Sequence, residues 1–307
     1  MKNPFYSLSN DSLTVAKAIG CGLGASLLLL PILAYGWRQA QRPDRSEAAQ
    51  VLFQGITYQR QVRISPRPNV VHIVQVDLSQ SNIRPFVTPA DPVEGDHAAA
   101  RTTSEFVEQF QLQIAINGHF FHPFREETPW NYFPHSGELA RPVGLAVAAG
   151  ESYAPASDDF PALCFLSKQA VIRADGTCPA ETTEAIAGTP IVLQQGQPAI
   201  PADFAEKPYA RAAVGLDRNG QTLWLVVIDG KQPRYSEGMT LAEVAAILQE
   251  LGAETALNLD GGGSTTLVTT ANGLPQILNA PIHTKWPMRE RPVATQLGFY
   301  ANSVTAE

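Results

Sequence analysis

The clearest hydrophobic pattern of the chain lies between residues 222 and 260. Leu223 to Ile228 is continuously apolar, as is typical of a central strand buried on both faces. An apolar stripe with helical spacing follows Thr240 and ends at Gly252, and the alternation at Leu257 and Leu259 predicts a second short strand. A strand, a helix and a strand at this spacing predict a βαβ unit with parallel strands and a right-handed crossover.

The same reasoning predicts further elements. Thr102 with Glu105, and Thr240 with Glu243, have capping-box spacing, so we expect helices over 102–110 and from 240 onwards. Additional strands are expected at Val70–Leu78, Gln113–Asn117, Val143–Ala148, Thr189–Gln195 and Arg211–Leu216. The rest of 122–160 reads as a long loop. We therefore predict an α+β fold: one domain with a mixed β-sheet that contains βαβ units and flanking helices.

A long uncharged segment lies near the amino terminus. Ala18 to Trp37 is twenty residues without a charge, a length that can cross a bilayer. We expect an uncleaved membrane anchor helix within residues 1–37, a linker over 38–54 and a domain over 55–303. A cleaved signal peptide and a buried core helix are the alternatives. The anchor would place the domain outside the cytoplasm, in the periplasm or at the cell surface.

Charge and cysteine usage narrow the classes of partner. The formal net charge is -7 and no segment is rich in lysine or arginine, so we expect no nucleic-acid partner. Cys164 and Cys178 lie outside the anchor and flank two short strand-like runs. A disulfide across a hairpin would fit an oxidising compartment, and two unrelated buried thiols are the alternative.

Candidate chemistry concentrates where the strands of the predicted βαβ unit end. Asp229 follows the first strand and Asp260 follows the second, so parallel strands would put both carboxylates on one sheet edge. If residues 70–117 join that sheet in the same way, Asn117 arrives there too. Two carboxylates on such an edge suit acid, base or nucleophilic catalysis at an acetal carbon.

A glycine-rich turn follows Asp260 directly. The glycines at 261–263 let the backbone approach a ligand closely, and their N–H groups can bind an anion together with Ser264 and Thr265. A guanidinium at Arg211 could hold a phosphate through two hydrogen bonds. The alternative for Arg211 is a surface arginine paired with a glutamate.

Six segments between residues 117 and 294 carry most of these groups. They are Asn117-Gly118-His119-Phe120-Phe121, Arg211-Ala212-Ala213-Val214-Gly215, Asp229-Gly230-Lys231-Gln232, Ser236-Glu237-Gly238-Met239-Thr240-Leu241, Asn258-Leu259-Asp260-Gly261-Gly262-Gly263-Ser264-Thr265 and Arg291-Pro292-Val293-Ala294. In this order they resemble the motifs of the phosphodiester glycosidase family, and the resemblance spans residues 55–301. It implies a hydrolase that cleaves a sugar-1-phosphodiester into the sugar and a phosphomonoester.

The resemblance and the residue types together define the expected site. Asp260 is expected to be the catalytic nucleophile or base, Asp229 to orient the sugar or the water, and Arg211 to stabilise the phosphate. The expected substrate-binding residues are Asn117, Gly118, His119, Asn258, Gly261, Gly262, Gly263, Ser264 and Thr265. We expect a glycan or sugar-phosphate partner, no metal ligand and no cofactor, although Asp229 and Asp260 could share a divalent cation.

His119 departs from the family pattern, which usually has a second glycine at this position. An imidazole there could fill the sugar pocket, bind phosphate as a cation, carry a proton or narrow the site. His119 and His122 lie on a turn and are not expected to bind a metal as a pair. His135 and His283 are expected to be solvated.

Other functions stay open at this point. A non-catalytic protein for glycan binding or exopolysaccharide assembly would keep the fold, and a phosphoesterase would cleave the P–O bond instead. The expected location suggests a cell-envelope or exopolysaccharide glycan as the substrate. A P-loop is excluded because no Gly-Lys-Ser/Thr follows the glycines.

Overall fold

The computed structural model describes residues 29–201 and 206–304. Its contacts divide the chain into two units, Met1–Arg42 and Pro43–Glu307. Residues 29–40 are helical, and within the described residues no helix is long and apolar enough to cross a membrane. Most of the predicted anchor, residues 1–28, lies outside the described residues, and the described part does not support it.

The largest sheet of the second unit has eight strands in the order β1-β2-β3-β19-β18-β20-β16-β17. Their bounds are β1 (Ala48–Phe53), β2 (Ile56–Arg63), β3 (Asn69–Asp77), β19 (Thr222–Ile228), β18 (Arg211–Leu216), β20 (Thr255–Asn258), β16 (Ile191–Gln194) and β17 (Gln197–Pro198). β1 lies within the stretch 38–54 that we expected to be a linker, and it pairs with β2 along its length.

The prediction of a mixed sheet with βαβ units is wrong, and the molecule is mostly β. β19, α3 (Leu241–Glu250) and β20 follow one another in the chain as predicted. However, β18 lies between the two strands and is antiparallel to both. β19 and β20 therefore point the same way without pairing. Hydrophobic periodicity located the strands, but it carries no information on which strand lies between them.

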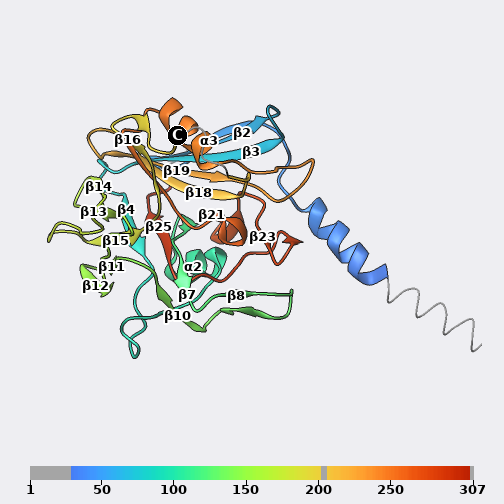
Figure 1. Ribbon diagram of the computed structural model, residues 1–307, viewed down its shortest axis with the longest axis horizontal. Helices are drawn as coiled ribbons and strands as arrows, with labels where there is room; N and C mark the ends of the chain where they lie inside the picture. Colours follow the sequence, from blue (N-terminus) through green and yellow to red (C-terminus); the bar gives the residue numbers. More distant parts are fainter. Residues whose placement is uncertain (1–28, 202–205, 305–307) are drawn as a thin grey trace, which may run out of the picture. The chain divides into compact units, whose positions relative to one another are not determined.

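Two five-stranded sheets pack against the inner face of the large sheet (Figure 1). One has the order β22 (Leu274–Ile277), β21 (Leu267–Ala271), β6 (Ile114–Asn117), β25 (Gln296–Tyr300), β4 (Arg84–Val87). The other has the order β12 (Glu151–Ala154), β11 (Ala146–Ala148), β15 (Glu184–Ala187), β13 (Ala162–Phe165), β14 (Ala170–Arg173). Asn117 ends β6 and so does not belong to the sheet of β3, contrary to the expectation for residues 70–117.

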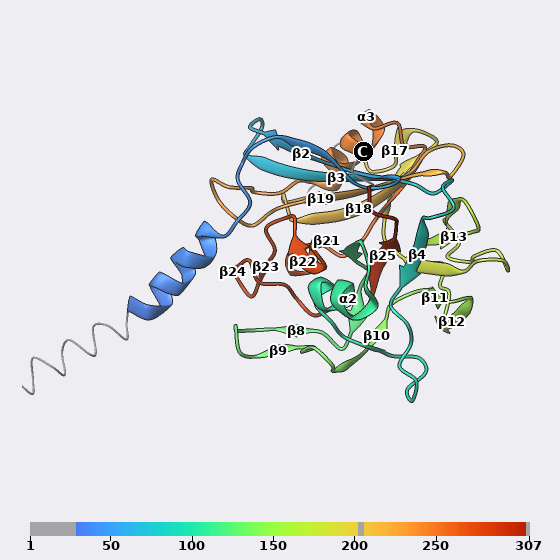
Figure 2. The same ribbon diagram turned by 180° about the vertical axis from the view of Figure 1, so that it is seen from behind.

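Within the described part of the second unit, two α-helices cover the outer faces of two sheets (Figures 1 and 2). α3 buries Val244 and Leu248 against the large sheet, and α2 (Thr103–Phe110) buries Phe106 against the sheet of β6. Both predicted capping boxes are present, at Thr102 and at Thr240. Each such cap is worth about 1 kcal/mol.

The segment predicted as a long loop contains short strands. β7 (Phe121–His122), β10 (Leu139–Pro142) and β5 (Ala98–Ala99) form one small sheet. β8 (Arg125–Glu126) pairs only with β9 (Tyr132–Phe133), and β23 (Ile282–His283) pairs with β24 (Trp286–Pro287). Strands of two residues are too short to produce a period in the sequence.

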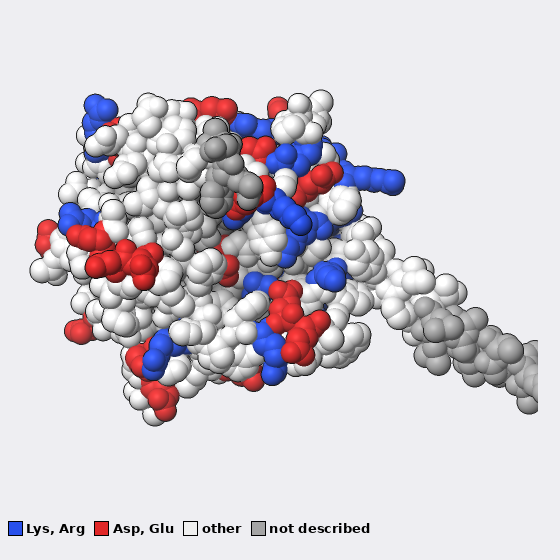
Figure 3. Space-filling view, viewed as in Figure 1, with Lys and Arg blue, Asp and Glu red and all other residues white. Residues whose placement is uncertain are grey.

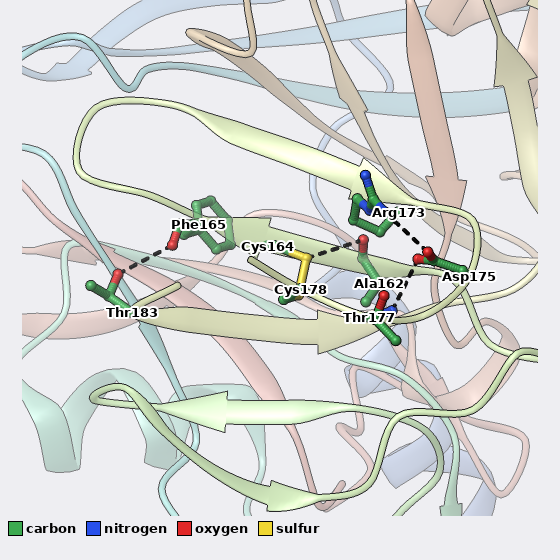
Figure 4. Close-up of a disulfide and its surroundings, with 8 residues drawn as sticks. All are labelled: Ala162, Cys164, Phe165, Arg173, Asp175, Thr177, Cys178 and Thr183. Atoms are coloured by element: carbon green, nitrogen blue, oxygen red, sulfur yellow. Dashed lines mark hydrogen bonds and ion pairs between the residues drawn. A yellow bond between two sulfur atoms is a disulfide. The ribbon is translucent and has the colours of Figure 1, made fainter. Parts of the chain in front are cut away.

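Cys164 and Cys178 form the disulfide that the sequence suggested (Figure 4). Cys164 lies on β13, and the bond closes a loop of sequence separation 14 that contains the β13–β14 hairpin, with a Cα–Cα distance of 5.7 Å. The loop is also held by the ion pair between Arg173 and Asp175, at 3.0 Å. The alternative of two unrelated thiols is therefore wrong.

Candidate active site

The chain from Asp260 to Thr266, called the glycine turn below, contains the 3-10 helix η1 (Gly262–Ser264). Gly262 has a φ of +64°, and a Cβ there would lie 2.5 Å from the Tyr209 ring. Gly263 lies against the guanidinium of Arg291, which a Cβ would overlap. The glycines therefore let the backbone come close to two side chains of the chain itself.

Asn117 closes the glycine turn. Its Nδ2 donates to the carbonyl of Asp260 at 2.7 Å, and its Oδ1 accepts from the N–H of Thr266 at 3.1 Å. The carbonyl of Gly118 accepts from the N–H of Asp260 at 3.0 Å. Asn258 likewise donates to two backbone carbonyls. These residues hold the turn in place, with their amide donors directed at the main chain.

Asp260 is partly exposed and is linked to a buried cation through one hydroxyl. Ser264 Oγ donates to Asp260 Oδ2 at 2.5 Å and accepts from Arg291 Nη1 at 2.9 Å. Burial raises the pKa of Asp260, while the Ser264 hydrogen bond and the Arg291 charge act in the opposite direction. A carboxyl in this setting can serve as a nucleophile, a base or an acid within a narrow pH range.

Arg291 is 6% exposed and provides the guanidinium of the site. It forms an ion pair with Glu126, donates from Nε to His283 Nδ1 at 3.3 Å, and lies 4.7 Å from the Phe124 ring centroid. His283 was expected to be solvated but is 1% exposed, and burial lowers its pKa to about 3. It is therefore neutral at physiological pH.

A second positive group lies at the rim of the glycine turn. Lys231 is exposed, and its Nζ lies 4.2 Å from the centroid of the Tyr209 ring, which packs on Gly262. The Lys231 charge lowers the pKa of Asp260 in part. Figure 3 shows positive and negative side chains intermixed on one face of the molecule.

Asp229 is fully buried, and its carboxylate has three donors. Oδ2 lies 3.1 Å from His72 Nε2, and Oδ1 accepts from Asn279 Nδ2 at 3.1 Å and from the N–H of Ala280 at 2.8 Å. The Tyr58 hydroxyl lies 2.8 Å from His72 Nδ1, and burial raises the pKa of Tyr58 to about 12. The Tyr58 hydroxyl keeps its proton and can donate it to Nδ1, and Nε2 of the same ring faces the carboxylate of Asp229.

Asn279 connects Asp229 to the glycine turn, because its Nδ2 also donates to the carbonyl of Thr265 at 3.1 Å. Asp229 therefore supports the turn from the core and has no exposed atom with which to orient a sugar.

Arg211 lies on the other face of the large sheet. Ala213, on the same side of β18, packs beneath α3, whereas Val227 and Asp229 face the core between the sheets. Arg211 forms an ion pair with Glu206 and donates from Nε to the carbonyl of Met239 at 3.1 Å. Arg211 is therefore paired with a glutamate, as in the alternative given for it in the sequence analysis.

His119 is 2% exposed; its ring stacks on Phe120 with a centroid distance of 4.4 Å and meets the Phe160 ring edge-on at 5.5 Å. Burial lowers its pKa to about 3, so it is not a cation that could bind phosphate at physiological pH. Neither ring nitrogen has a hydrogen-bond partner among the described residues.

A comparison with protein families identifies the family of the chain. The model of the phosphodiester glycosidase family matches residues 110–300. The chain belongs to the phosphodiester glycosidase family. It is thus a hydrolase, and the family predicted from the six segments is confirmed. No curated protein matches the chain.

Solved structures share the fold of this phosphodiester glycosidase. A hypothetical protein from Synechocystis is 17% identical with a TM-score of 0.63, over 86% of this chain and 65% of that chain. The catalytic domain of zebrafish N-acetylglucosamine-1-phosphodiester alpha-N-acetylglucosaminidase is 20% identical with a TM-score of 0.56, over 87% and 93%. A protein of Burkholderia pseudomallei is 16% identical with a TM-score of 0.57, over 76% and 74%.

Sequence reasoning missed several residues of the candidate site. Arg291 was part of a quoted motif but received no role, and Glu126, His283 and Asn279 gave no local signal. A surface pocket of about 440 Å³ lies beside Arg101 at the start of α2, and none of its lining residues belongs to the glycine turn. Among the described residues, no group of three or more His, Cys, Asp or Glu could hold a metal ion.

Proposed function

We propose that this phosphodiester glycosidase cleaves the bond between the anomeric carbon of a sugar and a phosphodiester oxygen, with Asp260 as the catalytic carboxylate. The observation that carries the proposal is the partly exposed Asp260, which shares the Ser264 hydroxyl with the buried Arg291. Asp229 and Arg211 have no direct part in this proposal, because one is fully buried and the other is paired on the opposite face of the sheet.

The proposed reaction passes through an oxocarbenium-like transition state. The C–O bond breaks, and its electron pair leaves with the phosphate as a phosphomonoester. Asp260 either attacks the anomeric carbon or takes a proton from the water that attacks it. Arg291 and Lys231 supply positive charge toward the departing phosphate. We propose that these two cations replace a metal ion, so a chelator should leave turnover unchanged.

Turnover of UDP-N-acetylglucosamine and of simple sugar-phosphate diesters tests the proposal when run in heavy-oxygen water. We expect free sugar that carries the label at the anomeric oxygen and an unlabelled phosphomonoester. Label in the phosphate would instead indicate a phosphoesterase that cleaves P–O. Ligand binding without turnover of any glycosyl phosphodiester would indicate a glycan-binding protein.

We also propose that the protein works in an oxidising, extracytoplasmic compartment on a phosphate-linked envelope or exopolysaccharide glycan. The Cys164–Cys178 disulfide supports the compartment. Peptide mapping of protein isolated from its own cells, with thiols alkylated before digestion, should find the two cysteines linked. Alkylated Cys164 and Cys178 would contradict this location.

A further inference from the structure

The carboxylate of Glu126 occupies a site that is built for an anion. One oxygen forms the ion pair with Arg291, and the other accepts from the N–H of Thr284 at 2.8 Å and lies 3.6 Å from His283 Nδ1. Arg291 Nη1 contacts Ser264, so this anion site adjoins the proposed catalytic carboxylate. A guanidinium and a backbone N–H that converge on one position are typical of phosphate recognition.

The site remains an anion site without Glu126. The Arg291 side chain is 7% exposed, and a buried guanidinium requires a partner of opposite charge. His283 Nδ1 accepts from Arg291, which places the proton of the neutral imidazole on Nε2, and this buried nitrogen has no partner among the described residues. A phosphodiester matches the single charge of a carboxylate, and inorganic phosphate or a phosphomonoester brings more charge and more acceptor oxygens.

Glu126 belongs to a part of the chain that few bonds hold in place. Among the strands that the structure describes, β8 and β9 pair only with each other, and Figure 2 shows them at the margin of the unit. Residues 124–128 are exposed, and Trp130 near the tip is 81% exposed. Besides Glu126, Pro129 and Tyr132 of this hairpin both meet Arg289. Tyr132 also packs edge-on against the His283 ring, and Phe124 lies against the guanidinium of Arg291.

We propose that Arg291 and the N–H of Thr284 form the phosphate subsite of the substrate, and that Glu126 occupies it until a phosphate displaces the carboxylate and releases the β8–β9 hairpin. The assignment rests on the proposed function, because it places the phosphate beside Asp260. It makes Glu126 an internal competitor of the substrate, held near the subsite by its own chain.

Direct binding of inorganic phosphate tests this proposal without any turnover. Calorimetric titrations would compare the unmodified protein with the Glu126→Gln and Glu127→Gln variants. Removing a tethered competitor, whose effective concentration is on the order of millimolar or above, should tighten phosphate binding about tenfold or more in Glu126→Gln. Glu127→Gln changes the charge by the same amount on the same hairpin but does not contact Arg291. Its affinity should match that of the unmodified protein.

Two further measurements test the proposal if the Glu126→Gln variant folds poorly. In the unmodified protein, saturating phosphate should increase proteolytic cleavage between residues 127 and 131, and no change would contradict the proposal. Adding Arg291→Lys to Glu126→Gln should abolish the gain in affinity. The proposal would also be overturned if all variants bound phosphate with equal affinity, or if Glu127→Gln gained as much affinity as Glu126→Gln.

These outcomes separate the subsite from the proposed reaction. A phosphate gain in Glu126→Gln without turnover of any glycosyl phosphodiester would leave the subsite standing and contradict the reaction. Turnover without the phosphate gain would contradict the subsite alone.

Discussion

Asp229 and Asp260 follow two strands that point the same way in one sheet, yet their surroundings differ. Asp229 lies in the core with three donors on its carboxylate, and none of its side chain is exposed. Asp260 is partly exposed, with one hydroxyl shared with a buried guanidinium. A similar position at a strand end thus supports two roles, and the donors around each carboxylate decide which one it has.

The largest expected effect is on turnover. Asp260→Asn keeps the shape of the side chain but removes the nucleophile or base, so kcat should fall by about 10³ or more, equivalent to about 4 kcal/mol. Asp229→Asn should lower kcat by less than about tenfold per folded molecule, because Asp229 acts on the glycine turn only through Asn279. The exposed Asp158→Asn serves as the control for both. The contrast fails if Asp229→Asn loses as much activity as Asp260→Asn while fully folded.

Stability should show the reverse order. Asp229→Asn leaves buried donors without an ionised acceptor, so the free energy of unfolding should fall by about 3–5 kcal/mol. Asp260→Asn should change it by less than about 1 kcal/mol or increase it, because burial disfavours the charge that is removed. Urea denaturation at pH 7 measures both. If Asp260→Asn lost more free energy of unfolding than Asp229→Asn, Asp260 rather than Asp229 would be the carboxylate that stabilises the fold.

Glu184 sharpens the comparison as a third carboxyl, which is buried and lies away from the site. Both its oxygens accept backbone N–H groups, yet burial raises its pKa to about 7. The folded state then holds a proton that the unfolded state releases above about pH 4.5. The free energy of unfolding should therefore fall by up to about 3 kcal/mol between pH 4.5 and 7, and level off above.

Glu184→Gln should flatten that part of the pH–stability curve, and Asp260→Asn should leave it in place. Denaturation curves collected across this pH range test the assignment. An unchanged slope in Glu184→Gln would assign the dependence to another group.

The smallest expected effect concerns the pH dependence of turnover. The Ser264 hydroxyl lowers the pKa of Asp260, so Ser264→Ala should raise that pKa and lower kcat about tenfold. If Asp260 acts ionised, activity rises with pH through its pKa, and the acid limb of kcat/KM should move to higher pH. Asp229→Asn should leave this limb unmoved, and an equal movement in both variants would contradict the separation of roles.

Local features of the fold could be predicted from the sequence. Arg211–Leu216 has the predicted bounds, and both capping boxes form at the expected residues. These features depend on neighbours within a few positions, for which propensity and periodicity carry information. The order of the strands does not depend on near neighbours, because contacts between distant segments place β18 between β19 and β20.

The candidate site shows the same limit. Asp260 and the glycine turn were found because they are contiguous and follow an apolar strand. The Arg291–Glu126 pair joins a loop to strand β8 across 165 positions of the chain, and no local pattern connects them. The burial of Asp229 and His283 could not be predicted either, because the residues that enclose them come from other elements.

The place of β18 in the large sheet has a consequence for engineering. Neighbouring strands in a ladder are about 4.8 Å apart, so the ends of β19 and β20 are held about 10 Å from each other by main-chain bonds alone. Exchanging either acidic side chain leaves that spacing intact. New chemistry could therefore be introduced at one strand end without redesigning the other.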